Sequence, residues 1–282
     1  MVNYIVGVGS QRAGSTLLYR ILDECSSVFM HPVKELHYYD TLFNVRDEKV
    51  LKNFSKRQLD NFTGDISNSK KDHCFFRTNN MLYKNSVANI SYHDLYRPCI
   101  MGNEYLCEIT PEYMILPIEG IAKMYEDLGP DTKIILIARN PVQRFISAVK
   151  LLKLYGGKPF NMAFFEEELL RVLDEMPHWV NVQDSLNDYE ACLNKYSKYF
   201  SKVLFISYDQ IVNSVEETHE TLEAFLDVSV DKGRYNELLN NKVNSLAKTG
   251  IISEKTQSIL RKRYQRETQY LAECFGVGAC VM

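Results

Sequence analysis

The sequence predicts an α/β fold in which a central, P-loop-like parallel β-sheet is flanked by helices on both faces. Apolar, β-branched runs at residues 4–8, 104–109, 133–138 and 203–207 are each long enough for one buried strand. Helical patterns separate these runs, and a glycine-rich loop follows the first of them. Continuous apolar strands that alternate with helices are typical of a parallel sheet covered on both sides.

The elements follow one another as two strand–loop–helix units and a helical remainder. The first unit has a strand at 4–8 and a helix at 16–25, with Leu17, Leu18, Ile21 and Leu22 on one helical face. In the second unit, at 118–152, a helix precedes the strand KIILIA, and Pro141 opens the next helix.

The remaining segments are predicted to be mostly helical. A helix around 185–200 precedes the last strand, and an amphipathic helix at 254–274 lies within a helical C-terminal part, 214–275. Residues 41–98 are polar and lack a clear period, so we expect an insertion of short helices and loops over the sheet edge.

Composition sets limits on the function. The chain has 282 residues, 45% of them hydrophobic and 24% charged, which predicts one domain over residues 1–282. A net charge of −3 gives no long-range attraction to nucleic acid or an anionic membrane, so any anion must bind in a local pocket.

Cysteine usage and the first residues predict a cytoplasmic protein. The seven cysteines are odd in number, widely spaced and without a CxxC pair, which predicts buried thiols and neither a zinc site nor a disulfide framework. The chain enters a strand at once, and its longest aliphatic run, at 134–138, is too short to span a bilayer. The sequence makes no prediction of oligomeric state.

The loop GVGSQRAGSTLL has the glycine spacing of a phosphate-binding loop but not its lysine. Gly9 and Gly14 match GxxxxGK[ST], yet Ser15 follows Gly14. Backbone N–H groups and the dipole at a helix start favour an anion, and the guanidinium of Arg12 can hold two of its oxygens. We expect a phosphate- or sulfate-like group to be bound here by Gln11, Arg12, Ala13, Gly14, Ser15, Thr16 and Leu17.

Arg139 marks a second anion site. It ends the strand at 133–138, and both loops open on the same carboxyl edge of a parallel sheet. Ser147 lies about two helical turns later and can add a hydroxyl, although a serine that bonds back to a helix carbonyl fits the spacing equally well. Two anion sites on one edge predict a ligand phosphorylated at both ends.

Four stretches carry a family resemblance. GSQRAGSTLL resembles the 5′-phosphosulfate loop, and ARNPVQRFISAVK the 3′-phosphate motif, of sulfotransferases that use 3′-phosphoadenosine 5′-phosphosulfate (PAPS). KELHYYD at 34–40 and EITPEYM at 108–114 resemble KExxFF and EKSPxYF of the Golgi carbohydrate branch, which includes the heparan sulfate enzymes. The resemblance extends over residues 4–275, most weakly between 41 and 98, and SLNDYEACLNKY at 185–196 is similar to a later motif of that branch, GxYxxxLxxW.

The resemblance implies a sulfotransferase fold, PAPS as donor and release of PAP, with no metal required. It places Glu35 as the catalytic base and Arg12 as the cation at the bridging oxygen of the phosphosulfate. His37 is a second candidate for proton transfer. Lys248 lies where related enzymes place a late basic loop over the 3′-phosphate.

The acceptor is implied less closely than the reaction. Lys34, Glu108 and Tyr113 are the expected substrate-binding residues, and the insertion at 41–98 is expected to shape the acceptor site. Ile109 replaces the lysine of EKSPxYF, which weakens the transfer of heparan-type specificity more than that of the reaction. The expected partner is a small-molecule or glycan acceptor.

Two other functions fit the same loop. A P-loop kinase would need a lysine after Gly14 and a carboxylate to hold Mg²⁺, whereas the strand at 133–138 leads into Arg139. A catalytically silent PAPS-fold protein, binding a partner through the 41–98 insertion, would not need Glu35.

Overall fold

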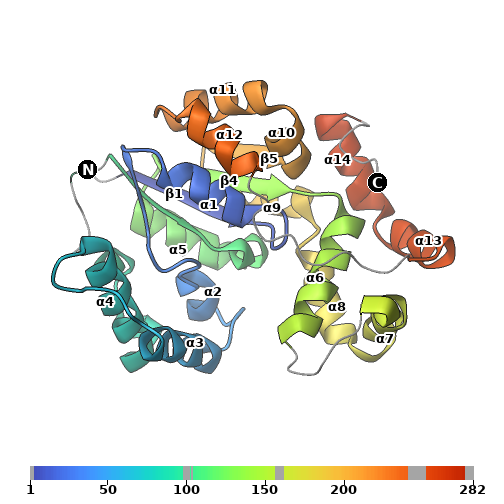
Figure 1. Ribbon diagram of the computed structural model, residues 1–282, viewed down its shortest axis with the longest axis horizontal. Coiled ribbons are helices and arrows are strands. Elements are labelled where there is room, and N and C mark those ends of the chain that lie inside the picture. Colours follow the sequence, from blue (N-terminus) through green and yellow to red (C-terminus); the bar gives the residue numbers. More distant parts are fainter. Residues whose placement is uncertain (1–2, 98–101, 103, 156–161, 241–251, 277–282) are drawn as a thin grey trace.

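The computed structural model describes residues 3–97, 102, 104–155, 162–240 and 252–276 (Figure 1). Within these residues, five parallel strands form one sheet in the order β2-β3-β1-β4-β5. The strands are β1 (Asn3–Gly9), β2 (Val28–Met30), β3 (Tyr105–Ile109), β4 (Lys133–Ala138) and β5 (Val203–Ser207). The predicted α/β fold with a parallel sheet is confirmed, including all four predicted strands.

The edge strand β2 was not predicted. Its three residues, VFM, are all buried, and they pair only with β3 among the described strands. A run of three apolar residues is too short to show a strand period, so the sequence pattern gave no signal for it.

Alternation along the strands divides the core into two layers. Ile5 of β1 packs with the helices of one face, and Val6 with those of the other. The first face carries α1 (Ser15–Asp23), α10 (Tyr208–Asn213), α11 (Val215–Leu226) and α12 (Lys232–Asn240). The second carries α2 (Tyr38–Leu42), α5 (Ile118–Leu128) and α9 (Tyr189–Tyr196), as Figure 1 shows.

Residues 41–98 contain helices and loops, as predicted. The helices are α3 (Glu48–Asp60), α4 (Lys70–Lys84) and the short 3₁₀ turns η1 (Val87–Asn89) and η2 (Tyr92–Leu95). Asp47 and Ser69 cap α3 and α4 by accepting hydrogen bonds from backbone N–H groups. The insertion packs beside β2 and β3, because Leu51 and Leu82 share a core cluster with Phe29 and Leu106.

A third group of helices extends beyond the sheet. It comprises α6 (Pro141–Tyr155), α7 (Phe165–Glu175), α8 (Pro177–Ser185) and α13 (Glu254–Arg263), which share a separate apolar cluster. The prediction of a single helix at 254–274 is wrong. The helix is interrupted at the buried Tyr264, and α14 (Gln265–Phe275) follows. The helix predicted at 185–200 is shorter, since α8 ends at Ser185 and α9 occupies Tyr189–Tyr196.

The prediction of buried thiols without a disulfide framework is only partly confirmed. Cys25, Cys107 and Cys192 are buried free thiols and Cys274 is an exposed one, but Cys74 is disulfide-bonded. Among the described residues, no helix has the length and apolar character needed to cross a bilayer.

Candidate active site

Gly14 shapes the loop between β1 and α1. Its φ of 103° lies in the left-handed region, and a Cβ atom there would come within 2.7 Å of the Tyr208 ring. As the N-cap of α1, Gly14 supplies no side-chain acceptor for the first N–H groups of the helix. Ala13, Ser15 and Leu17 are buried, so these predicted loop residues would reach a ligand mainly through backbone N–H groups.

The structure brings the two predicted anion sites into contact. Arg12 Nε donates a hydrogen bond to Ser147 Oγ over 3.0 Å, although the residues are 135 positions apart. Ser147 therefore faces the loop. This favours a ligand-binding serine over one that bonds back to a helix carbonyl. Arg139 Nη1 in turn donates to the backbone oxygen of Arg12 over 3.1 Å.

Two tyrosines position Arg139. The Tyr189 hydroxyl donates to the Arg139 carbonyl over 2.9 Å and accepts from the Arg139 N–H over 3.3 Å. The Arg139 guanidinium lies 5.0 Å from the centre of the Tyr208 ring, a cation–π distance. Its Nε atom is buried and has no hydrogen-bond partner among the described residues.

Arg144 fixes the backbone of the loop. This side chain is fully buried, and its guanidinium donates to the Gln11 carbonyl over 3.2 Å. It also donates to Asn187 and to both oxygens of Gln183. Burial lowers the pKa of Arg144. All of these partners are uncharged, and within the described parts of the chain neither Arg139 nor Arg144 lies within ion-pair distance of a carboxylate.

The segment KELHYYD has an unusual backbone. Glu35 (φ 65°) and His37 (φ 51°) are both in the left-handed region, which is costly for residues other than glycine. Its N–H groups are held in place: Leu36 donates to Glu108 Oε2 over 3.2 Å, and Tyr38 donates to the Tyr113 hydroxyl over 3.1 Å.

Glu108 and Tyr113 are thus part of the support for this segment. Both are essentially inaccessible to solvent, and Tyr113 donates its hydroxyl hydrogen to Glu108 over 2.8 Å. Burial raises the pKa of Glu108, while hydrogen bonds from Thr110, Tyr113, Leu36 and Tyr92 oppose that rise. Their polar atoms already have protein partners, which differs from the exposed position expected of substrate-binding residues.

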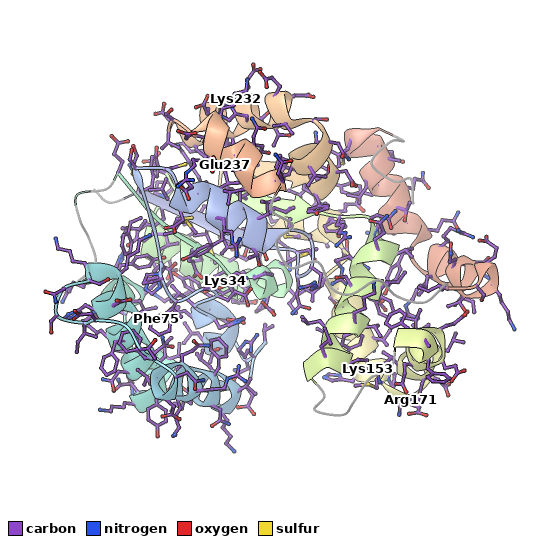
Figure 2. All side chains as sticks on the ribbon, in the orientation of Figure 1. Lys34, Phe75, Lys153, Arg171, Lys232 and Glu237 are labelled. Carbon is purple, nitrogen blue, oxygen red and sulfur yellow. The ribbon has the colours of Figure 1, made fainter. Side chains whose placement is uncertain are left out.

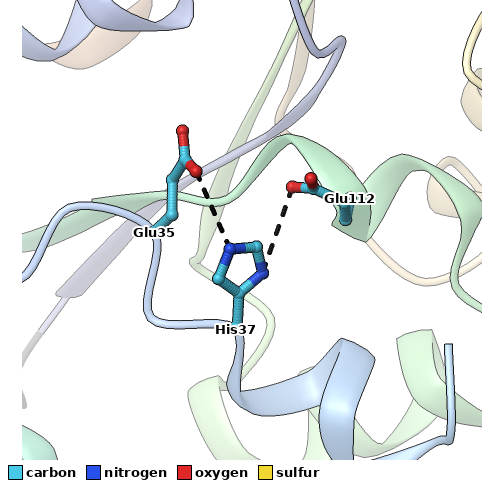
Figure 3. A group of neighbouring side chains, drawn as sticks. All are labelled: Glu35, His37 and Glu112. Carbon is cyan, nitrogen blue, oxygen red and sulfur yellow. Dashed lines mark ion pairs between the residues drawn. The ribbon is translucent and has the colours of Figure 1, made fainter. Parts of the chain in front are cut away.

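His37 lies among three carboxylates, of which Figure 3 shows Glu35 and Glu112. Its Nδ1 is 2.7 Å from Asp40 and 4.0 Å from Glu112, and its Nε2 is 3.7 Å from Glu35. Burial alone would lower the pKa of His37, but Glu112, Asp40 and Glu35 outweigh it and raise the pKa to about 10. Burial likewise opposes ionisation of Glu35, yet His37 and Lys34 hold its pKa well below the usual range.

Lys34 and Gln11 join this cluster to the loop. Lys34 Nζ lies 3.2 Å from Glu35 Oε1 and donates to Thr16 Oγ1 over 2.8 Å, from the central position seen in Figure 2. Gln11 Nε2 donates to Glu112 Oε1 over 3.1 Å. Lys34 thereby brings a cation to the first turn of α1, where the loop lacks its lysine. Lys248 lies outside the described residues.

The group of Glu35, His37 and Glu112 has ligand atoms within 4.8 Å of one another, a spacing that suits a metal ion. The two carboxylates, however, face different nitrogens of the imidazole ring (Figure 3). The raised pKa of His37 makes the ring itself the cation between them. The arrangement therefore favours a protonated histidine over a bound metal.

Sequence reasoning gave no role to several residues of the site. Some stand inside the quoted motifs, and Tyr208 follows the end of β5, where a parallel sheet presents its ligand-binding edge. Nothing in the linear pattern distinguishes them from packing residues. They are Asp40, Glu112, Arg144, Tyr189 and Tyr208.

Comparison with known proteins places this site in a family. The chain matches the model of the sulfotransferase family over residues 5–232. A sulfotransferase from Alicyclobacillus acidocaldarius is similar in structure, with 20% identity, coverage of 100% of this chain and 97% of that one, and a TM-score of 0.60. A sulfotransferase domain from the curacin biosynthetic pathway shares 16% identity, over 94% of this chain and 98% of that one, at a TM-score of 0.49. Comparison with curated protein sequences gave no match.

The first of these structures supports the fold, and the family match includes both predicted anion-binding segments and the Glu35 segment. These comparisons support the family as a whole and not its Golgi branch in particular. Since the match covers well over half of the sequence, the chain belongs to the sulfotransferase family, a family of PAPS-dependent transferases.

Proposed function

We propose that this sulfotransferase moves the sulfuryl group of PAPS to a hydroxyl or amine of a carbohydrate or glycoconjugate acceptor, with Glu35 as the base. One observation carries the proposal: on one edge of the sheet, the Arg139 guanidinium, which has no carboxylate partner among the described residues, contacts the loop beside an ionised carboxylate held by Lys34 and His37.

The polar groups around the loop fit the donor. Arg139 has a buried Nε without a hydrogen-bond partner in the described structure, and a buried polar atom of this kind is costly unless a ligand satisfies it. Arg139 and Ser147 would hold the 3′-phosphate, and residues 11–17 the 5′-phosphosulfate. When bound, PAPS supplies a sulfuryl group that is activated by its bond to the 5′-phosphate.

Glu35 and Arg12 divide the chemistry. Glu35 is ionised at neutral pH, because its pKa is lowered, and it accepts the acceptor proton as the acceptor oxygen or nitrogen bonds to sulfur. The bond from sulfur to the bridging oxygen breaks in line with this attack, and PAP leaves. Arg12 stabilises the negative charge that develops on the bridging oxygen; its guanidinium remains charged and does not donate a proton.

The other cluster residues prepare Glu35. His37 is protonated at neutral pH and so acts as a positioning residue and not as a base. Lys34 lies between Glu35 and Thr16, where its charge can stabilise the moving sulfuryl oxygens. Together, Arg12 and Lys34 would supply the positive charge that a metal brings to other transfer enzymes, so we propose that no metal takes part.

The acceptor is assigned by resemblance. KELHYYD and EITPEYM are similar to segments of the carbohydrate branch, which favours a sugar hydroxyl or amine. The Ile109 side chain is buried, so no charge enters the site at the position of the family lysine. We therefore propose that acceptor specificity differs from the heparan type and depends on residues 41–98. Glu108 and Tyr113 support the Glu35 segment by accepting hydrogen bonds from its backbone.

The test is to incubate the protein with PAPS and a panel of oligosaccharides, lipids, phenols and peptides, and to look for an added sulfate by mass spectrometry. Sulfation of an oligosaccharide is the expected result. Calorimetry with PAP and with ATP serves as the control for the donor. ATP binding without PAP binding would overturn the proposal in favour of a kinase, and PAP binding without any transfer would favour a silent binding protein.

A further inference from the structure

Lys150 lies one helical turn beyond Ser147 on α6. Residues three apart are neighbours on a helix surface, so Lys150 continues the side of α6 on which Ser147 meets Arg12. Its Nζ atom is 5.8 Å from the centre of the Phe165 ring. The ammonium group thus lies over the first residue of α7, and Arg139 and Arg12 are near enough to act on its charge.

Lys150 is a cation near other cations. Burial, Arg139 and Arg12 all act to lower the pKa of its ammonium group. In the described part of the chain it has no carboxylate within ion-pair distance. A partly buried charge with like charges nearby and no counter-ion is unfavourable unless a ligand supplies the opposite charge.

The next lysine of the same helix shows the usual arrangement. Lys153 lies one turn further along α6 and forms an ion pair with Glu168 of α7, with an N–O distance of 2.5 Å. Figure 2 shows Lys153 on the part of α6 that faces α7. The two lysines therefore differ in their counter-ion: among the described residues, a carboxylate pairs with Lys153 and none pairs with Lys150.

We propose that Lys150 is a further PAPS-binding residue that contacts the 3′-phosphate together with Arg139 and Ser147. This inference rests on the proposed function of the site. Lys150 follows Ser147 by one turn of α6, whereas the residues proposed for the phosphosulfate lie in the loop before α1 and in its first turn, so we assign Lys150 to the 3′-phosphate. A phosphate monoester carries up to two negative charges at neutral pH, which matches a site with more than one cation. Lys150 would then help the enzyme to select 3′-phosphorylated nucleotides.

Calorimetric titration of PAP and of adenosine 5′-monophosphate (AMP), which lacks the 3′-phosphate, tests this assignment. Lys150→Ala is expected to weaken PAP binding about 10- to 100-fold, the usual effect of one charged hydrogen bond, and to leave AMP binding within about twofold of the wild type. The matched control Lys153→Ala should leave both affinities unchanged. Lys150→Arg should recover most of the PAP affinity.

Unchanged PAP binding in Lys150→Ala, or an equal loss for PAP and AMP, would overturn the inference while leaving the proposed function intact. A wild-type protein that fails to bind PAP would instead overturn the proposed function. If Lys150→Ala does not fold, as judged by its thermal transition, Lys150→Gln removes the charge while keeping most of the side-chain length and gives the same comparison.

Discussion

Two neighbouring regions of the site differ in whether their cations are paired with carboxylates. The first, which we call the anion region, comprises Arg12, Arg139, Arg144, Ser147 and Lys150. Its cations Arg139, Arg144 and Lys150 have no carboxylate partner among the described residues. In the second, the carboxylate cluster (Lys34, Glu35, His37, Asp40, Arg46 and Glu112), every cation is paired with at least one carboxylate.

The difference indicates what each region is built for. Cations without counter-ions are costly in a folded protein and become favourable when an anionic ligand arrives, so the anion region is suited to binding. A cluster whose charges balance within the protein needs no ligand to be stable, and it holds one carboxylate in a fixed geometry and ionisation state. The anion region should therefore control donor affinity, and the carboxylate cluster should control turnover.

The largest expected effect comes from the centre of the carboxylate cluster. Glu35→Gln keeps the shape of the side chain but removes the proton acceptor, so kcat should fall about 10²- to 10⁴-fold, the usual contribution of a general base. PAP affinity, measured by calorimetry, should stay within twofold. Glu119→Gln, at an exposed position on α5, is the matched control and should alter neither quantity. A parallel loss of PAP affinity in Glu35→Gln would mean that Glu35 is a donor-binding residue.

Breaking the anion region should have the reverse pattern. Arg139→Ala removes a guanidinium that also holds the backbone of Arg12, and we expect PAP affinity to fall about 30- to 100-fold, or about 2–3 kcal/mol. Arg139→Lys keeps the charge without the planar guanidinium, so its PAP affinity should lie between those of the wild type and Arg139→Ala. Titration of PAP into the three proteins checks this order. An unchanged affinity combined with a lower kcat would reverse the roles that we assign to the two regions.

The charge of His37 can be tested through the pH dependence of stability. Its pKa of about 10 in the folded protein lies above the unfolded value of about 6.5, so the stabilisation is complete below pH 6.5 and is lost as the pH rises toward 10. Glu35, whose pKa is lowered, stays ionised throughout this range.

The Tm difference between wild type and His37→Gln should therefore be largest at pH 6 and should shrink by pH 10. Each unit of pKa shift corresponds to about 1.4 kcal/mol, so the effect should reach the order of a few kcal/mol. His73→Gln, at an exposed position on α4, controls for the substitution itself. A Tm difference that stays constant from pH 6 to pH 10 would show that His37 is not held in its charged form.

The smallest expected effect comes from a residue that acts through Arg139. Tyr189→Phe removes the hydroxyl that contacts both the N–H and the carbonyl of Arg139, and PAP affinity should fall about 3- to 10-fold, equivalent to about 1 kcal/mol. Tyr235→Phe is the matched control: this buried tyrosine donates to Ile211 on the other face of the sheet over 2.9 Å. Tyr189→Phe and Tyr235→Phe should lose similar stability, but only Tyr189→Phe should bind PAP more weakly. Equal PAP affinities of the two variants would show that Tyr189 does not position Arg139.

The comparison also shows how far the sequence could predict the site. The residues of the anion region stand at fixed places after strands β1 and β4, so glycine spacing and strand order were enough to place Arg12, Arg139 and Ser147 on one edge. The direct contact between Arg12 and Ser147 could not be foreseen, because it depends on how α6 packs against the loop.

The carboxylate cluster is harder to predict because its residues come from three segments with no common period. Glu35 was proposed by resemblance and His37 as a histidine close to it, whereas Glu112 and Arg46 join the cluster through tertiary packing. Glu108 and Tyr113 lie next to the Glu35 segment, but their burial, which the linear pattern does not reveal, gives them supporting contacts to its backbone.

The separation of the two regions is the central claim, and a double-mutant cycle tests it most directly. Glu35→Asp and Arg139→Lys both keep their charge, so the single variants and the double variant should retain measurable kcat/KM with PAPS and the acceptor found in the panel. If the regions act independently, the two fold-losses multiply, with a coupling energy within about 0.5 kcal/mol of zero. If kcat/KM of the double variant is no lower than that of the less active single variant, binding and proton transfer depend on one shared network, and the account is contradicted.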